Sequence, residues 1–413
     1  MATTTQLPVH GQGVFLFTAT ASPCVITVST ADQASGLRIE FASDHVHVTD
    51  IASLAPLVDP KNNAGLSTHA GAYSWFSLDS QNQRLHAGVG EARLETAVYT
   101  YTYPSAEKAV FERTKQFLES LTTVSSDSIR ILRVQKDPIN LKTPLVIKHV
   151  DELTIEHVAS SSHMPIVNLP PICQKLYQCI SGKKFVLNTP DFPDFVQAIE
   201  YSIRTPGRWC HDKLQQKSRE FNPEKPNLLE TYLRITLGNN NGESPGIPYV
   251  MEIWPVGHYS PIHSHANASA IIRVLNGSIN VSLYPFLCAE KDGVAPFSNA
   301  TFNTDDVTWI TPMLNQTHQL KNLEANSYTC ITIQCYMYTE ADRCHYDYFD
   351  YLDADGAKQT YEPDSDMDFL EFKARIRAEW AARPLTAAAP VAPPMAASVP
   401  VVAAAAGWRC WKC

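Results

Sequence analysis

Two histidines separated by one residue lie in the segment 254–265, which reads WPVGHYSPIHSH. Alternate side chains of a β-strand face the same side, so His263 and His265 can point together into a barrel. A third imidazole from a distant strand would complete three ligands on one face of a metal ion. His318 is the best candidate, because it follows a predicted strand at 306–311. Imidazole ligands suit iron, nickel, copper or zinc, so these residues predict a transition-metal site without choosing the metal.

The His-x-His spacing is a weak signal by itself in a chain with 14 histidines. A second such pair, His45 and His47, lies in a β-type run without neighbouring glycine or proline, and we interpret it as an ordinary strand pair. The setting of the other pair is different, because Gly257 lies six residues before it and Gly277 twelve residues after it. These intervals suit the turn, strand and turn of one barrel hairpin. The alternative is a polar barrel interior in which other side chains satisfy the imidazoles.

The elements that would position these histidines follow a β-rich N-terminal half. Short β-type runs from about Gly13 to Tyr103, separated by turn residues, indicate an antiparallel sandwich-like domain. A helix is expected over 105–121, and a strand pair at 129–134 and 145–153 would complete this half. The half carries no visible catalytic set. We expect its aromatic Trp75 to be a core residue rather than a platform for a ligand.

The domain boundary is predicted in the short, polar, proline-containing stretch 160–171. This gives a β-rich domain at 1–160, for which a lectin-like or ligand-binding role stays open, and a second domain at 161–384. The remaining residues, 385–413, are rich in Ala, Pro and Val, end in WRCWKC and are predicted to be a low-complexity tail.

The second domain is expected to be mainly β. Prolines interrupt the helical stretch 172–221, which predicts several short helices before the strands. The β-type runs return over 232–338, and a last helix is expected over 366–380. The predicted fold class is therefore a β-barrel preceded by short helices, with an N-terminal antiparallel β-sandwich-like domain.

The segment from Gly257 to Gly277 resembles the first motif of the cupin superfamily, Gly-x5-His-x-His-x3-4-Glu-x6-Gly. Pro312, His318 and Asn322 resemble the second cupin motif, which ends Pro-x-Gly-x2-His-x3-Asn. This chain has one extra residue and no glycine between Pro312 and His318. The resemblance implies a jelly-roll barrel with a metal site.

One departure from the cupin motif concerns the ligand set. Ser269 or Ala270 stands where most cupins carry a metal-binding glutamate, so neither spacing offers a carboxylate. Three neutral imidazoles leave a divalent ion with its full charge, which favours an anionic ligand from the substrate, for example a thiolate.

Residues 164–382 are similar to cysteine dioxygenase, a non-haem iron enzyme with three histidine ligands and helices before a cupin barrel. The matching pieces are Tyr232-Leu233-Arg234, 257–265, Val274-Leu275 with Gly277, His318, Tyr336 and Cys344-His345. The resemblance implies iron(II) on the three histidines and a substrate carboxylate on Arg234, whose planar fork suits it. It also implies that Tyr232 and Cys344 border the substrate pocket and that Tyr336 points at the bound thiol and oxygen.

Other positions depart from that family. Ala270 stands where the animal enzymes have a cysteine that is linked to the tyrosine, so a thioether with Tyr336 is excluded. In that family a serine and a histidine form a hydrogen-bonded relay that supports the tyrosine. Gln334 stands in place of the histidine and Thr332 in place of the serine. A glutamine can form hydrogen bonds but cannot titrate. These differences bear on the rate of turnover and on the identity of the substrate more than on the metal.

The resemblance implies a thiol dioxygenase that oxidises L-cysteine, or a related thiol acid, with O₂ to the sulfinate. Two alternatives stay open: a non-catalytic metal-binding cupin that acts as a sensor or binding protein, and a cupin enzyme with a non-thiol substrate. The expected partners are therefore a small thiol and O₂.

Composition excludes other partners. The net charge of -9 gives no electrostatic reason to bind nucleic acid or an anionic membrane. No apolar run reaches the roughly 18 to 20 residues that a membrane span needs. Ten cysteines are scattered without a repeating framework, as expected for reduced thiols, so we expect a cytoplasmic protein.

Overall fold

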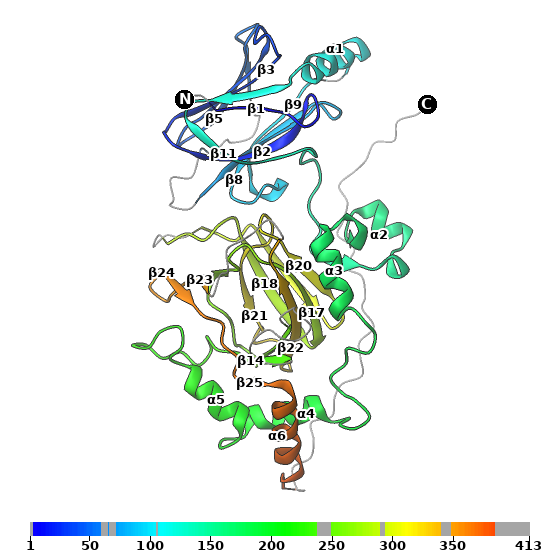
Figure 1. Cartoon of the computed structure of the whole chain (residues 1–413), viewed down its shortest axis with the longest axis vertical. Coiled ribbons are helices and arrows are strands. Elements are labelled where there is room, and N and C mark those ends of the chain that lie inside the picture. The colour runs from blue at the N-terminus through cyan, green and yellow to red at the C-terminus, as the bar shows by residue number, and fades with distance from the viewer. Residues whose placement is uncertain are drawn as a thin grey trace.

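The computed structural model describes residues 3–58, 65, 72–104, 106–237, 249–289, 294–339 and 348–384. Two β units are stacked along the long axis of the molecule, the N-terminal one at the top of the view and the other below it (Figure 1). Together they contain four sheets, whose strands pair almost entirely antiparallel. The fold class is mainly β, as the sequence predicts.

The N-terminal unit is a sandwich of a six-stranded and a five-stranded sheet. In sheet order, the first contains β1 (Thr3–Gln6), β10 (Thr123–Ser126), β3 (Cys24–Ser29), β4 (Gly36–Phe41), β5 (Val46–Asp50) and β6 (Pro56–Leu57). The second contains β11 (Ile129–Gln135), β2 (Gln12–Ala19), β7 (Ser74–Asp79), β8 (Arg84–Val89) and β9 (Ala97–Thr102). A short turn of helix, η1 (Leu94–Thr96), precedes β9, and α1 (Lys108–Glu119) follows it.

Every second side chain along the strands points between the two sheets and forms the core of this sandwich. In β3, Ile26 and Val28 are fully buried between the sheets, and Phe17 of the opposite sheet meets Phe41 edge to face, with 5.0 Å between the ring centroids. Trp75 is also fully buried, which confirms that it is a core residue. It packs on the other face of the five-stranded sheet, in a cluster that includes Met313 of the second unit. That sheet is therefore covered on both faces.

The second unit is a double-sheet barrel. Its eight-stranded sheet contains β13 (Met164–Pro165), β12 (Ile147–Lys148), β20 (Val307–Ile310), β17 (Ser269–Asn276), β22 (Cys330–Met337), β15 (Tyr249–Trp254), β14 (Leu233–Leu237) and β25 (Met367–Asp368). Its six-stranded sheet contains β19 (Ser298–Asn303), β18 (Ser278–Tyr284), β21 (Thr317–Lys321), β16 (His263–Ser264), β23 (Phe349–Leu352) and β24 (Lys358–Tyr361). From β15 to β23 the chain repeatedly crosses from one sheet to the other. This crossing is typical of a jelly-roll barrel.

Short helices cover the barrel, and three of them lie over 171–217, where the prolines predict several short helices. The helices are α2 (Ile155–Ser160), α3 (Pro171–Ile180), α4 (Phe195–Arg204), α5 (Trp209–Lys217) and α6 (Phe369–Ala381), with short turns η2 (Val150–Glu152) and η3 (Ile166–Asn168). The last helix begins and ends within three residues of its predicted bounds. In the described part of the chain, none of these helices is long and apolar enough to cross a membrane.

One predicted strand pairing is wrong. The segment 145–153 was expected to pair with 129–134 in the N-terminal half, but β12 within it pairs with β20 and β13 of the barrel. Residues 150–152 form a helical turn instead of a strand. A short β-type run does not specify its partner strand, because pairing is a long-range contact. The domain boundary near residue 160 stays a prediction.

Candidate metal centre

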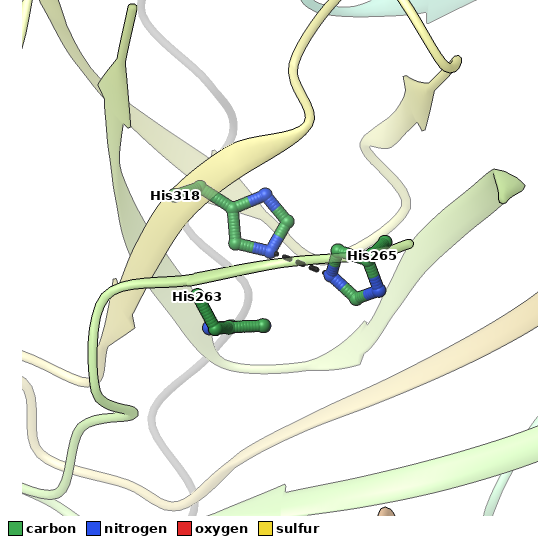
Figure 2. A group of neighbouring side chains, drawn as sticks. All are labelled: His263, His265 and His318. Atoms are coloured by element: carbon green, nitrogen blue, oxygen red, sulfur yellow. Dashed lines mark hydrogen bonds between the residues drawn. The ribbon is translucent and has the colours of Figure 1, made fainter. Parts of the chain in front are cut away.

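Three imidazoles converge inside the barrel. His263 begins the two-residue strand β16 and lies directly opposite His318 of β21 in the antiparallel register. His265 follows the same strand on the same side, as alternation predicts. One ring nitrogen of each histidine lies within 4.8 Å of those of the other two. Figure 2 shows the three rings clustered together, with a dashed line between His265 and His318. The Nε2 atoms of His265 and His318 are 3.0 Å apart.

The backbone fixes which nitrogen two of these rings present. His263 Nδ1 lies 3.0 Å from the carbonyl oxygen of Pro261, and His318 Nδ1 lies 3.2 Å from that of Asn315. A carbonyl only accepts hydrogen bonds, so each Nδ1 carries the proton and each Nε2 is left unprotonated, with a lone pair that can accept a hydrogen bond or bind a metal. Metal-binding histidines are commonly oriented through their second nitrogen in this way.

Burial keeps all three imidazoles neutral. The pKa of His263 is lowered to about 4, mainly by desolvation; the hydrogen bond to the Pro261 carbonyl opposes this shift, and the positive charge of Arg234 adds to it by a smaller amount. The pKa values of His265 and His318 are held well below the usual range, first by desolvation and then by the neighbouring imidazoles. Neutral imidazoles at neutral pH are the form that binds a metal.

The donor set fits a divalent transition metal. Two imidazole nitrogens that each lie about 2.1 Å from one ion, at a right angle to each other, are about 3.0 Å apart. His265 Nε2 and His318 Nε2 have this separation. Of the residues that the structure describes, only these three form a group of histidines, cysteines or carboxylates close enough to share an ion. The choice among iron, nickel, copper and zinc does not follow from the ligands.

The histidines open into a small buried pocket that also contains three predicted site residues, Tyr232, Arg234 and Tyr336. The other lining residues are Phe221, Glu252, Trp254, Pro261, Ile272, Leu320, Gln334, Phe349, Tyr351 and Tyr361. The fourth predicted pocket residue, Cys344, lies outside the described residues. The pocket therefore joins residues from β14, β15, β16, β21, β22 and β23, which are far apart in the sequence.

An ion pair in this pocket was not predicted. Arg234 of β14 lies directly opposite Glu252 of β15, and Arg234 Nη1 donates to Glu252 Oε1 at 3.1 Å. Both side chains are buried. Burial alone would lower the pKa of Arg234, but the carboxylate of Glu252 and the neighbouring tyrosine hydroxyls together outweigh it, so the net shift is upward. Burial raises the pKa of Glu252, and the charge of Arg234 partly offsets this rise.

Aromatic rings enclose His265. Tyr336 is stacked on it with 5.6 Å between the ring centroids, and Phe349 meets it at 4.6 Å. Burial, followed by the charge of Glu252, raises the pKa of Tyr336, so its hydroxyl stays protonated and can donate a hydrogen bond. Ala270 is the cross-strand neighbour of Tyr336. The position expected for a linked cysteine is therefore adjacent to the tyrosine, and alanine cannot form the link.

Two conspicuous polar residues near the motif have structural contacts elsewhere. His258 Nδ1 lies 2.9 Å from the carbonyl oxygen of Thr231, and Asn322 Nδ2 donates to the carbonyl oxygens of Trp254 and Tyr328. These contacts hold the loop before His263 rather than supply ligands.

The sequence interpretation missed Glu252 and the pocket aromatic residues other than Tyr232 and Tyr336, such as Phe349. Alternation along 250–254 places Glu252 on the same side as Val250 and Trp254. That signal shows a shared face, but only the pairing of β14 with β15 shows that the face is the pocket.

No family model matches this chain. Among solved structures, a cupin domain of an XRE-family transcriptional regulator from Enterobacter cloacae is 14% identical over 26% of this chain and 98% of its own, with a TM-score of 0.21. A cupin-domain protein from Halorhodospira halophila is 18% identical over 38% of this chain and 84% of its own, with a TM-score of 0.20. An oxalate oxidase in complex with glycolate is 17% identical over 28% of this chain and 53% of its own, with a TM-score of 0.21.

The first two of these structures are of cupin-domain proteins, but the likeness of all three is confined to a minor part of this chain. The class of fold rests instead on the crossing of the chain between two facing sheets and on the position of the three histidines. Together these features define a cupin-type barrel with a candidate metal centre.

Proposed function

We propose that this protein is an iron(II)-dependent thiol dioxygenase whose preferred substrate is L-cysteine or a closely related aminothiol acid. The observation that carries the proposal is a ligand set of three histidines that shares one buried pocket with Arg234 and Tyr336. When bound, iron(II) supplies the redox chemistry that adds both atoms of O₂ to the thiol sulfur, so that RSH and O₂ give RSO₂H.

The ligands support an anionic substrate group beside the ion. His263, His265 and His318 are neutral, so they do not offset the charge of a divalent cation. A thiolate does offset it. Tyr336 remains protonated and is positioned to donate a hydrogen bond in the pocket. The aromatic side chains, including Phe349, exclude water from the reacting groups.

The Arg234–Glu252 pair supports a substrate that carries both charges of an amino acid. Arg234 Nη1 donates to Glu252, but Arg234 Nε is buried without a hydrogen-bond partner among the described residues. A substrate carboxylate would satisfy that donor, and Glu252 offers an acceptor to the substrate ammonium. Cysteine has both groups, whereas 3-mercaptopropionate lacks the ammonium and cysteamine lacks the carboxylate.

The same ion pair favours a second candidate function. Glu252 already neutralises much of the charge of Arg234, so the pocket also suits a bound ligand without a carboxylate. We therefore retain a metal-binding cupin without turnover as the alternative. Thiol-dependent oxygen uptake separates the two functions.

The test uses protein reconstituted anaerobically with one iron per chain. Oxygen consumption is followed with cysteine, 3-mercaptopropionate and cysteamine in parallel, and sulfinate is identified by mass spectrometry. We expect one sulfinate per O₂ consumed, fastest with cysteine. The His318→Ala protein is the control for oxidation by free iron. No uptake with any of the three thiols would contradict the proposal and favour the binding protein.

A further inference from the structure

Two charged residues of the N-terminal unit lie beside the metal centre of the barrel. Glu91 and Arg93 follow β8, and each is about 1% exposed. Glu91 Oε1 accepts a hydrogen bond from the backbone N–H of Gln316 at 2.9 Å. Arg93 Nη1 donates to Asn315 Oδ1 at 2.9 Å. Both contacts join positions more than 200 residues apart in the sequence, and both end on the turn that precedes His318.

That turn is attached to two of the three histidine ligands. The carbonyl oxygen of Asn315 accepts from His318 Nδ1 at 3.2 Å. Gln316 Oε1 accepts from the backbone N–H of His265 at 3.0 Å. Gln316 Nε2 donates to the carbonyl oxygen of Ala268 at 2.8 Å, so this one side chain spans the turn that follows His265. A displacement of Asn315 and Gln316 would therefore move both ligands.

The backbone on both sides of these contacts has an unfavourable conformation. Ala266 and Asn267, directly after His265, have φ values of 47° and 64°, and Asn315 has a φ of 62°. This left-handed region is disfavoured for residues other than glycine, although asparagine tolerates it better than alanine does. Such a conformation persists when surrounding contacts hold it. Gln316 holds the first turn, while Arg93 binds the side chain of Asn315 in the second.

The two units pack tightly where Glu91 and Arg93 meet the barrel. The backbone N–H of Glu91 donates to the carbonyl oxygen of Pro285 at 3.1 Å. Gly90 has a φ of +77°, and a Cβ on it would overlap Pro285. The Arg93 guanidinium lies 4.7 Å from the ring centroid of Phe297. Figure 1 shows the N-terminal sandwich directly beyond this end of the barrel.

We propose that Glu91 and Arg93 are positioning residues of the metal centre, so that the N-terminal unit completes a site whose ligands all lie in the barrel. Glu91 holds the Gln316 backbone, and Gln316 holds the turn that presents His265. Arg93 binds Glu91 Oε2 at 3.2 Å and orients Asn315, whose carbonyl oxygen orients His318. This inference depends on the metal site but not on the dioxygenase activity.

The test measures metal affinity in the full chain. Iron(II) is titrated anaerobically against a competing chelator for the wild-type protein, Glu91→Ala, Glu91→Gln and Glu95→Ala. Loss of groups that orient metal ligands commonly weakens affinity by about 10-fold to 100-fold. We expect a loss of this size for Glu91→Ala and a smaller one for Glu91→Gln, which keeps an acceptor for the Gln316 N–H.

Glu95 provides the matched control. Its carboxylate also pairs with Arg93, at 3.4 Å, but its side chain is 18% exposed, and in the described part of the chain the Gln316 N–H bonds to Glu91 instead. Thermal unfolding of the metal-free proteins measures the structural effect of each change separately. We expect Glu95→Ala to bind iron within about twofold of the wild-type affinity, because the contact to the ligand turn is retained. An equal loss of affinity in Glu95→Ala and Glu91→Ala would overturn the proposal.

A variant on the barrel side tests the same contact independently. Gln316→Glu keeps the side-chain size and an acceptor but removes the two N–H donors that hold Ala268 and Thr311. We expect it to weaken iron binding, and this variant replaces Glu91→Ala if that protein does not fold. Wild-type affinity in both Glu91→Gln and Gln316→Glu would show that these residues do not position the ligands.

Discussion

The chain contains two described His-x-His pairs on β-strands, and they have opposite environments. His45 and His47 lie in and beside β5 of the N-terminal sandwich, where both are exposed. His263 and His265 lie at β16 of the barrel and cluster with His318 of the neighbouring strand β21. The spacing is identical, so the strand period explains only that the members of each pair share a face. The sheet around the strand decides whether that face meets water or a third histidine.

The residues between and after the histidines explain the difference. Val46 and Val48 are buried in the core of the sandwich, so alternation turns both histidines of β5 outward. At the barrel site the strand has only two residues, and its neighbour β21 places an imidazole in register with the first histidine. A ligand cluster thus requires a partner strand as well as a spacing.

The largest expected effect of any single change is at His318. His318→Ala removes one of three ligands and should abolish measurable iron binding, whereas the barrel should remain folded because most of its core is unchanged. Iron content after anaerobic loading and gel filtration measures the loss, and circular dichroism checks the fold. Full retention of iron would mean that the ligand assignment is wrong.

Arg234 should give the next largest effect. Arg234→Met removes the proposed anchor of the substrate carboxylate and leaves Glu252 buried without its partner. Loss of one member of a buried charge pair typically weakens binding by about 2 to 5 kcal/mol. We expect most of the loss in the apparent affinity for cysteine and little in the affinity for cysteamine. Steady-state kinetics with both thiols provide the comparison. Unchanged cysteine kinetics would exclude Arg234 as the anchor.

Tyr336 should have a smaller effect. Tyr336→Phe keeps the ring that is stacked on His265 and removes only the hydroxyl, so the fold and iron content should not change. A single hydrogen bond contributes about 0.5 to 1.5 kcal/mol, which corresponds to a decrease of roughly tenfold or less in turnover. The measurement is the oxygen-uptake rate at saturating cysteine. A normal rate would place the hydroxyl outside the reaction.

His47 should have the smallest effect and completes the comparison between the two pairs. His47→Ala changes an exposed side chain in a strand whose core residues are untouched, so stability should change by less than about 0.5 kcal/mol. Iron content should equal that of the wild-type protein. A loss of iron in this variant would show that the N-terminal pair also binds metal.

The sequence predicts the features that depend on local periodicity. These include the β-rich class, the short helices, the last helix and the shared face of His263 and His265. The pairing of 145–153 and the role of Glu252 could not be predicted, because both depend on which strands become neighbours. Strand pairing joins distant segments, and a strand of a few residues carries little information about its partner. The contact of Glu91 with Gln316 was missed for the same reason, since it crosses from one unit to the other.

The three barrel histidines are proposed to hold the metal ion of a thiol-binding pocket. An anomalous difference map, recorded at the iron absorption edge on crystals soaked anaerobically with iron(II) and cysteine, tests this most directly. We predict one strong peak in contact with a ring nitrogen of His263, His265 and His318, with the cysteine sulfur beside it and its carboxylate at Arg234. A peak at another position, or no peak between these histidines in a protein that retains iron, would show that they do not bind the metal.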